Sequence, residues 1–356
     1  MTDVSRISAV DLFCGVGGLT FGLEAAGIDV RLGVDIDPAC EYPIKQNTKA
    51  RFEKADVGEI KVEILAEALS DGEVRLLAGC APCQPFSTYA RSAKEMDADE
   101  TAREGRDDWK LVGRFGDIVR ALQPDLVTME NVPPLAKQPV FQKLLDDLKG
   151  YSVDYRVVEC QTIGLPQRRK RLVLVASKLG PINIPEFELA GTTVRKTIGD
   201  LPKLAAGQAD PADRLHRASN LSKLNLERIR ASTPGGTWRD WPEQLRAPCH
   251  ARETGVTYPS VYGRMEWDEP APTITTQCFG YGNGRFGHPE QDRAISLREA
   301  AMLQGFPKEY AFIPDNEPVS FAKLGRLIGN AVPVTLAEMI GKLLVEHIQG
   351  LKKANG

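Results

Sequence analysis

The chain has 356 residues, 42% of them hydrophobic and 26% charged, a composition typical of a globular protein with one large domain and a smaller one. No apolar run approaches the roughly 20 residues of a membrane-spanning helix, and residues 1–6 do not resemble a signal peptide. The seven cysteines are scattered and odd in number, which favours reduced thiols in a cytosol over a disulfide framework.

Charge is unevenly spread along the chain. The net charge is −3, but residues 1–150 hold 18 Lys and Arg against 26 Asp and Glu, whereas residues 151–356 hold 27 against 22. The second part could therefore meet phosphates, although an uneven scatter of solvated charges explains the same counts.

Strand-like apolar runs alternate with helical stretches over about the first 180 residues. The expected strands are Ser8–Phe13, Val30–Asp35, Arg51–Lys54, Val74–Ala78, Asp125–Met129 and Arg171–Ala176. The expected helices between them are Leu19–Ala26, Pro38–Gln46, Glu59–Leu69, Trp109–Leu122 and Val140–Leu148. This alternation predicts an α/β fold with a doubly wound, mostly parallel Rossmann-like sheet, covered by helices on both faces.

The first strand leads into a glycine loop, Gly15–Gly18, and the second strand ends at Asp35. Glycines allow close approach of the backbone to a ligand at a helix N-terminus, and an acid at the next strand end can accept from ribose hydroxyls. Thr20 stands where a dinucleotide fingerprint needs its third glycine. The pattern therefore indicates an adenosine-containing cofactor, while an ordinary strand-to-helix turn remains the alternative.

A proline-flanked thiol follows another apolar run, in Gly79–Ser87. Cys83 after Pro82 could be a placed nucleophile, a buried packing thiol, or half of a metal site with Cys80. The metal interpretation is weak because no second ligand pair with suitable spacing is present, so no metal is expected. Cys80 is interpreted as strand-end packing.

The carboxyl ends of parallel strands meet at one edge of a sheet, where ligands bind. Residues at or after these strand ends are Asp11, Gly15–Gly18, Asp35, Asp56, Cys83 and Glu130. Each alone could be a loop residue, but together they predict a site. The charged segment 87–108 is either a lid over this site or a solvated loop.

The last part of the chain begins with a Pro-rich linker, Gly180–Pro185, after which regular patterns fade until about Asp292. Tryptophans and arginines are interleaved in this irregular segment. Helical patterns return at Ser296–Gln304 and Val334–Ile348. Before the linker, Gln167–Arg171 is expected to place Gln167, Arg169 and Arg171 on one face of an extended segment.

Eight segments of the chain, in order, resemble the blocks of the cytosine-5 DNA methyltransferase family. They are Asp11–Gly18, Val34–Asp37, Ala55–Val57, Gly79–Ser87, Glu130–Val132, Gln167–Arg171, Arg298–Pro307 and Gly329–Val332. A Pro-Cys dipeptide alone would be weak evidence, but eight ordered blocks spanning nearly the whole chain are specific.

The resemblance implies an enzyme that transfers a methyl group from S-adenosylmethionine to carbon 5 of cytosine. Cys83 would attack carbon 6, and Glu130 would contact ring nitrogen 3 and the exocyclic amine. Arg169 and Arg171 would complete the catalytic set, with Arg171 holding the base. The implied cofactor-binding residues are Phe13, Gly15, Gly17, Gly18, Asp35, Ile36, Asp56, Val57, Pro82, Asn330 and Val332.

The resemblance also implies a DNA partner and a two-domain organisation. A base in a duplex must be flipped out to reach such a site. Residues 1–182 completed by 325–356 would form the catalytic domain, and 183–324 the small domain, with target recognition in about 185–292. The expected DNA contacts are Gln84, Ser87, Arg239, Arg264 and Arg285. A monomeric cytoplasmic enzyme of a bacterial or phage modification system, associated with the nucleoid, is the implied setting. The sequence leaves open whether a cognate restriction endonuclease accompanies it.

Three alternatives are weaker. A tRNA-methylating branch of the same family often carries Cys-Phe-Thr, and Cys278-Phe279-Gly280 matches it in part. A nicotinamide oxidoreductase would leave Cys83 and Glu130 unexplained and lacks the third glycine. A catalytically silent binding subunit would not need Cys83, Glu130 and Arg171.

Overall fold

The computed structural model describes residues 6–82, 107–251 and 259–355 and divides the chain into two compact units. Unit 1 is Met1–Glu159, Lys170–Phe187 and Val334–Gly356; unit 2 is Cys160–Arg169 and Glu188–Pro333. The expected catalytic domain began its C-terminal segment at 325, whereas the compact unit begins it at Val334. The segment Cys160–Arg169, expected in the catalytic domain, belongs to unit 2.

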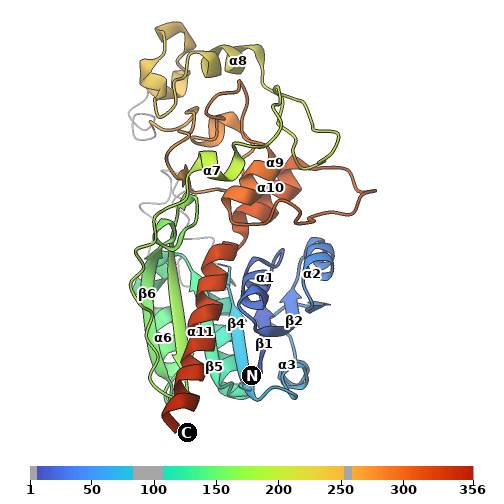
Figure 1. Cartoon of the computed structure of the whole chain (residues 1–356), viewed down its shortest axis with the longest axis vertical. Helices are drawn as coiled ribbons and strands as arrows, with labels where there is room; N and C mark the ends of the chain where they lie inside the picture. The colour runs from blue at the N-terminus through green and yellow to red at the C-terminus, as the bar shows by residue number, and fades with distance from the viewer. Residues whose placement is uncertain (1–5, 83–106, 252–258, 356) are drawn as a thin grey trace. The chain divides into compact units, whose positions relative to one another are not determined.

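Unit 1 is built on a seven-stranded sheet (Figure 1). Its strands are β1 (Ile7–Leu12), β2 (Asp29–Asp35), β3 (Arg51–Lys54), β4 (Val74–Gly79), β5 (Leu126–Asn131), β6 (Ser152–Glu159) and β8 (Lys170–Ser177). Their spatial order is β3-β2-β1-β4-β5-β8-β6, and only the pairings of β8 are antiparallel. The expected doubly wound, mostly parallel sheet is confirmed.

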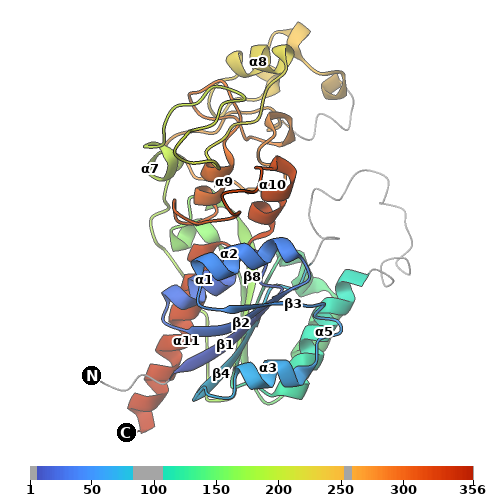
Figure 2. The same ribbon diagram turned by 90° about the vertical axis from the view of Figure 1, so that its right-hand side faces the viewer.

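Helices cover both faces of this sheet. They are α1 (Gly18–Ala25), η1 (Pro38–Cys40), α2 (Glu41–Asn47), α3 (Val62–Ala68), α5 (Asp107–Leu122), η3 (Pro133–Lys137), α6 (Pro139–Asp147) and α11 (Val334–Asn355). Figure 2 shows α3 and α5 on one side of the strands and α1 and α11 on the other. Every residue of β1 is buried, as expected for a strand covered on both faces.

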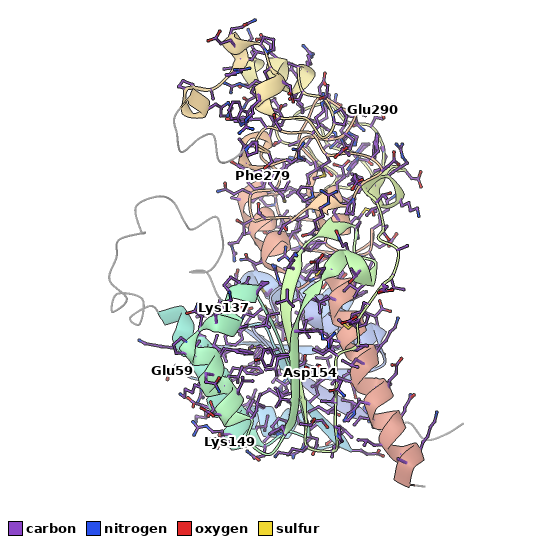
Figure 3. The ribbon with its side chains drawn as sticks, turned by 90° about the vertical axis from the view of Figure 1, so that its left-hand side faces the viewer. Glu59, Lys137, Lys149, Asp154, Phe279 and Glu290 are labelled. Carbon is purple, nitrogen blue, oxygen red and sulfur yellow. The ribbon has the colours of Figure 1, made fainter. Side chains whose placement is uncertain are left out.

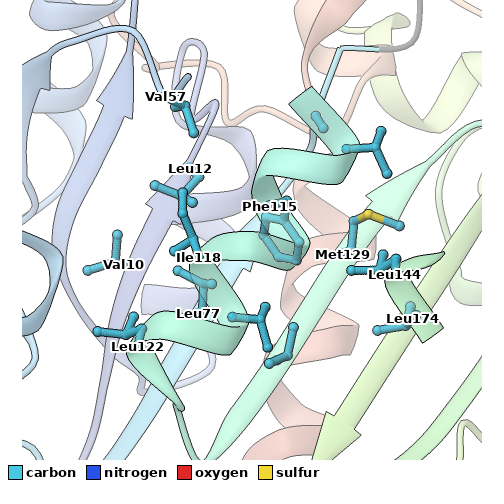
Figure 4. Close-up of a cluster of buried hydrophobic side chains, with 14 of the residues drawn as sticks. Val10, Leu12, Val57, Leu77, Phe115, Ile118, Leu122, Met129, Leu144 and Leu174 are labelled. Atoms are coloured by element: carbon cyan, nitrogen blue, oxygen red, sulfur yellow. The ribbon is translucent and has the colours of Figure 1, made fainter. Parts of the chain in front are cut away.

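One hydrophobic core lies between the sheet and the helices α3, α5 and α6 (Figure 4). Val10 and Leu12 of β1 point into it together with Phe115 and Ile118 of α5. Because side chains alternate along a strand, Asp11 faces the opposite side, toward α1. The sequence thus places one charged residue of β1 under the helix that follows the glycine loop.

On that opposite side, α1 and α11 pack with their backbones in close approach. A Cβ added to Gly22 would clash with Ala337 and lie 2.7 Å from the backbone nitrogen of Glu338. Gly341 of α11 likewise faces Ala26, 2.6 Å from where its own Cβ would be. Helix α11, the last helix of the chain, therefore packs with α1 on one face of the sheet that contains the first strand, β1.

Unit 2 has little regular structure. Its helices are η4 (Cys160–Ile163), α7 (Val194–Ile198), α8 (Lys223–Arg230), η5 (Trp238–Asp240), η6 (Glu243–Leu245), η7 (Pro248–Ala251), η8 (Tyr281–Asn283), α9 (Leu297–Leu303) and α10 (Phe321–Asn330). Its strands β7 (Gln167–Arg168) and β9 (Ala271–Pro272) form a short parallel pair. One of its cores gathers Ile229, Trp238, Trp241 and Tyr281, with His250 stacked 4.2 Å from Trp238.

A buried ion pair at the start of α9 also stabilises unit 2. Arg293 donates two hydrogen bonds of 2.7 Å to Glu299, and both side chains are almost fully buried. Burial would raise the pKa of Glu299, but the Arg293 hydrogen bonds and nearby charges lower it to about 2. Glu299 also accepts from the backbone of Ser296, which caps the helix in return.

The expected elements mostly agree with the observed ones, and the longest omissions are β6, α8 and α10. The strand β6 is missing from the prediction, although Val153, Tyr155 and Val157 alternate with polar residues along it; Tyr155 and Val157 face solvent, as on an edge strand. The helices α8 and α10 are also missing. By length and composition the stretch Phe321–Ala354 could cross a membrane, but 61% of the tested window is buried, as in a core helix.

Candidate active site

The loop after β1 has an unusual backbone. Phe13, Gly15 and Gly17 have φ values of 61°, 53° and 87°, all in the left-handed region. Glycine adopts this conformation freely, whereas for Phe13 it is strained, a property that concentrates at functional sites. A Cβ at Gly15 would have no heavy atom within 4 Å, so the backbone there borders open space. Gly18 is the first residue of α1.

Asp35, the last residue of β2, holds the loop after β1 in place through hydrogen bonds. Its carboxylate accepts from the backbone of Gly15 and of Asp37, each at 2.9 Å. The next residue, Ile36, is 63% exposed, which is high for an isoleucine. The backbone of Ala55 donates to the Asp35 carbonyl at 3.1 Å, which places the exposed Asp56 and the buried Val57 beside the same edge.

Below the loop lies the buried acid Asp11. Its Oδ2 accepts from Thr20 Oγ1 at 2.7 Å, and its Oδ1 has no hydrogen-bond partner. Burial raises the pKa of Asp11 to about 7, with a further rise from the charge of Asp35. Thr20, which breaks the dinucleotide fingerprint, therefore has its own function as the partner of this carboxyl.

Three neighbouring strands bring Cys80, Glu130 and Arg171 together. Gly79 pairs with Met129, so Cys80 is level with Glu130, while β5 and β8 run antiparallel and place Arg171 one step diagonally away. Arg171 Nε lies 2.7 Å from Glu130 Oε1, and Cys80 Sγ donates to Glu130 Oε2 at 2.8 Å. Glu130 is only 3% exposed. The interpretation of Cys80 as mere packing is incomplete, because its thiol contacts a predicted catalytic group.

Asn131 attaches the Pro-Cys turn to the same strand. Its Nδ2 donates to the carbonyl of Ala81 at 3.0 Å, and its Oδ1 accepts from the backbone of Val132. Pro82 is half-buried. The predicted residues Cys83, Gln84 and Ser87, and most of the 87–108 segment, lie outside the described residues. Asn131 is not among the predicted site residues, although it directly follows Glu130 in the segment Glu130–Val132.

Arg169 lies in unit 2, unlike Arg171. Its guanidinium is buried and donates to the carbonyls of Ile274 and Gly329. Gln167 and Gln304 extend this network across the ends of α9 and α10, with 2.7 Å between their side chains. Arg169 thus binds the backbone of its own unit. Of the two C-terminal residues expected at the cofactor, Asn330 is exposed and Val332 is buried.

The three arginines expected to contact DNA differ in availability. Arg264 is 5% exposed and donates to the carbonyls of Ile229, Ser232, His288 and Gln291 and to Asp292. With its donors used inside unit 2, Arg264 is not retained as a DNA contact. Arg285 is half-buried and donates to the Gly236 carbonyl, whereas Arg239 is exposed beside the Trp238 ring.

Comparison with known proteins agrees with this geometry. A family model described as C-5 cytosine-specific DNA methylase matches residues 7–346. The Type II methylase M.HgiDII of Herpetosiphon aurantiacus is 47% identical over 352 residues, covering 97% of this chain and 96% of that protein. The Type II methyltransferase M.Sau96I of Staphylococcus aureus is 29% identical, covering 97% and 79%.

A solved structure from Escherichia coli, described as a DNA modification methyltransferase encoded within a prophage, has the same fold. Its TM-score is 0.70 at 23% identity, with 97% of this chain and 100% of that chain covered. The strong match to DNA methylases favours DNA over the tRNA alternative. The chain belongs to the C-5 cytosine-specific DNA methylase family and is a DNA (cytosine-5-)-methyltransferase.

Proposed function

We propose that this enzyme is the sequence-specific modification methylase of a Type II system, acting through a covalent bond between Cys83 and carbon 6 of a flipped-out cytosine. The observation that carries this proposal is the buried Glu130 carboxylate, held by Arg171 beside the strand that leads into the Pro-Cys turn. The similarity to M.HgiDII and M.Sau96I supports the Type II assignment.

The carboxyl ends of strands β1, β2 and β3 form an edge of the sheet that fits S-adenosylmethionine. When bound, this cofactor supplies an electrophilic methyl group. Open space at Gly15 allows a ligand to approach the backbone, and exposed Ile36 offers an apolar surface to a purine ring. Asp35 uses one oxygen for each of two backbone amides, and a carboxylate has further lone pairs for ribose hydroxyls. We assign Phe13, Gly17, Gly18, Asp56, Val57 and Pro82 of unit 1 to the same cofactor. Asn330 and Val332 of unit 2 remain cofactor residues by resemblance to the family.

The chain's own residues then prepare the base. An unperturbed thiol is mostly protonated at neutral pH, so Cys83 must be activated to act as nucleophile. Attack at carbon 6 is favoured when ring nitrogen 3 receives a proton or a strong hydrogen bond, which we assign to the protonated form of the Glu130 carboxyl, because the carboxylate has no proton to donate. Arg171 holds the Glu130 carboxyl in place, and Arg169 supports the segment from which Arg171 extends.

DNA recognition is assigned to unit 2. That unit carries 20 Lys and Arg against 17 Asp and Glu, so it is basic while unit 1 is acidic. Exposed Arg239 and half-buried Arg285 are the retained candidates there, together with Gln84 and Ser87 near Cys83. We infer a monomeric cytoplasmic enzyme that works on double-stranded DNA and is accompanied by a cognate restriction endonuclease.

Methylation mapping tests this function. The chain is expressed in a host without cytosine methylation, and its DNA is analysed by bisulfite or long-read sequencing. We expect 5-methylcytosine at one short recurring sequence. Methylation spread over all sequence contexts would contradict sequence specificity, and its complete absence would contradict the proposed function.

The matched variant is Cys83→Ser. We expect it to abolish methyl transfer while DNA binding in a gel-shift assay stays at the wild-type level, because the hydroxyl is a much weaker nucleophile. Substantial remaining activity would refute Cys83 as the nucleophile.

A further inference from the structure

The thiol of Cys80 donates a hydrogen bond to a buried carboxylate. Its Sγ lies 2.8 Å from Glu130 Oε2, on the oxygen that Arg171 does not contact. Each oxygen of the buried carboxylate thus has its own neighbour, one cationic and one neutral.

The backbone fixes this contact. Cys80 donates its amide to the carbonyl of Leu12 at 3.2 Å, which ties it to the end of β1, while Glu130 is within β5. Asn131 attaches the following residue, Ala81, to the same strand. These bonds hold the Cys80 backbone level with Glu130, so that only a rotation of the Cys80 side chain separates the thiol from the carboxylate.

The chemistry of the contact determines the direction of the hydrogen bond. Burial raises the pKa of the Cys80 thiol well above its usual value, and the charge of Glu130 and the hydrogen bond to it raise it further. The thiol consequently stays protonated and donates. Because S–H is a weak donor, Oε2 retains most of its ability to accept from an exocyclic amine.

We propose that Cys80 is a positioning residue, whose thiol fixes the plane of the Glu130 carboxyl for contact with cytosine. This inference rests on the proposed function, in which Glu130 contacts the base. Arg171 alone holds one oxygen and leaves rotation about the last side-chain bond open; Cys80 holds the second oxygen and removes that freedom.

The test compares Cys80→Ala, which removes the donor, with Cys80→Ser, which restores one. The substrate is duplex DNA from a methylation-deficient host, tritiated at carbon 5 of cytosine. Addition of Cys83 to carbon 6 makes carbon 5 protonated and exchangeable, so tritium release to water without cofactor reports the attack alone. Methyl transfer from S-adenosylmethionine gives kcat and KM in parallel.

We expect Cys80→Ala to slow both tritium release and kcat by about tenfold, the size of one lost hydrogen bond to a charged group. Its KM for S-adenosylmethionine should stay unchanged, and Cys80→Ser should recover to within about threefold of wild type. The control Cys160→Ala removes a buried thiol of unit 2 and should leave tritium release unchanged once matched for folded protein by thermal unfolding.

The proposal is overturned if folded Cys80→Ala releases tritium at the wild-type rate, or if Cys80→Ser is as slow as Cys80→Ala. A wild-type protein that neither releases tritium nor methylates any DNA would instead overturn the proposed function, and this inference with it.

Discussion

Glu130 is a buried carboxylate whose oxygens face Arg171 and Cys80. A buried charge is expensive unless it is paired, and removal of one partner leaves the other uncompensated. The Arg171 side chain is itself 14% exposed, so most of the pair is shielded from water. The ion pair therefore has consequences for both stability and chemistry.

Arg171→Ala should lower methyl transfer by at least about a hundredfold and also destabilise unit 1, because Glu130 then stays buried without a cation. Activity is measured as methyl incorporation, and stability as the urea midpoint. The control is Arg168→Ala in the same Gln-Arg-Arg-Lys-Arg segment, where an exposed arginine pairs with the exposed Glu269 of unit 2. Such surface pairs contribute little, so this variant should stay within about twofold of wild type. Equal losses in both variants would argue against a specific role for Arg171.

Asp11 makes stability depend on pH. Its pKa is raised by burial from 3.8 to about 7 in the folded protein, so between about pH 4 and pH 7 the folded state holds a proton that the unfolded state has lost. The free energy of unfolding therefore falls as pH rises through this window and levels off above it. The size of this fall is on the order of 4 kcal/mol.

Asp11→Asn is neutral at every pH and should remove this dependence. In urea titrations from pH 5 to pH 8, its stability relative to wild type should rise up to about pH 7 and then stay constant. The control is Asp71→Asn, an exposed carboxylate, whose curve should run parallel to that of wild type. Parallel curves for Asp11→Asn as well would show that Asp11 is already ionised at low pH.

Most strands and helices of unit 1 were predictable from the sequence, whereas α10 was missed although its Leu324, Leu327 and Ile328 are buried. The expected strand Arg51–Lys54 coincides with β3, and the helix Val140–Leu148 overlaps α6. The missed strand β6 is at the edge of the sheet, and its Asp154, labelled in Figure 3, accepts a hydrogen bond from the backbone amide of Ile184 in the segment after β8. Contacts of that kind are tertiary, and periodicity does not report them.

The glycines of α1 and α11 give a prediction for helix packing. Gly22→Ala inserts a methyl group against Ala337 and the α11 backbone, and should destabilise the protein by about 1–3 kcal/mol. Gly350→Ala, also in a helix, adds its methyl group in open space and should stabilise by up to about 1 kcal/mol. Thermal unfolding measures both. Similar shifts in the same direction would show that helix propensity, and not the close approach, decides at Gly22.

On the scale of the whole molecule, the sequence blocks predicted which residues matter but not how they divide between units. Gln167–Arg171 reads as one block, yet Arg169 binds carbonyls of unit 2 while Arg171 pairs with Glu130 of unit 1. Arg264 resembled a surface arginine in an irregular basic segment, but its guanidinium is buried. Burial in a loop-rich unit depends on backbone carbonyls distant in sequence, and composition carries no record of them.

The chain order of the two units has a consequence for folding. Unit 2 is inserted between β8 and α11, so unit 1 is completed only by the last segment of the chain. Within α11, five side chains are at least 96% buried: Leu336, Ala337, Ile340, Leu344 and Ile348. Burial of a large aliphatic side chain contributes about 1.5–3 kcal/mol, so together they amount to much of the 5–15 kcal/mol by which proteins are typically stable.

Truncation after Pro333 should therefore abolish the cooperative unfolding of unit 1 and with it methyl transfer, whereas truncation after Lys352 should preserve both. Buried α11 side chains are lost in the first case, while the second removes only the chain end beyond them. Urea unfolding followed by circular dichroism, with methyl incorporation in parallel, distinguishes the two. If the shorter chain kept the wild-type transition, the sheet would be stable without its last helix, and α11 would not be part of the folding unit that carries Glu130.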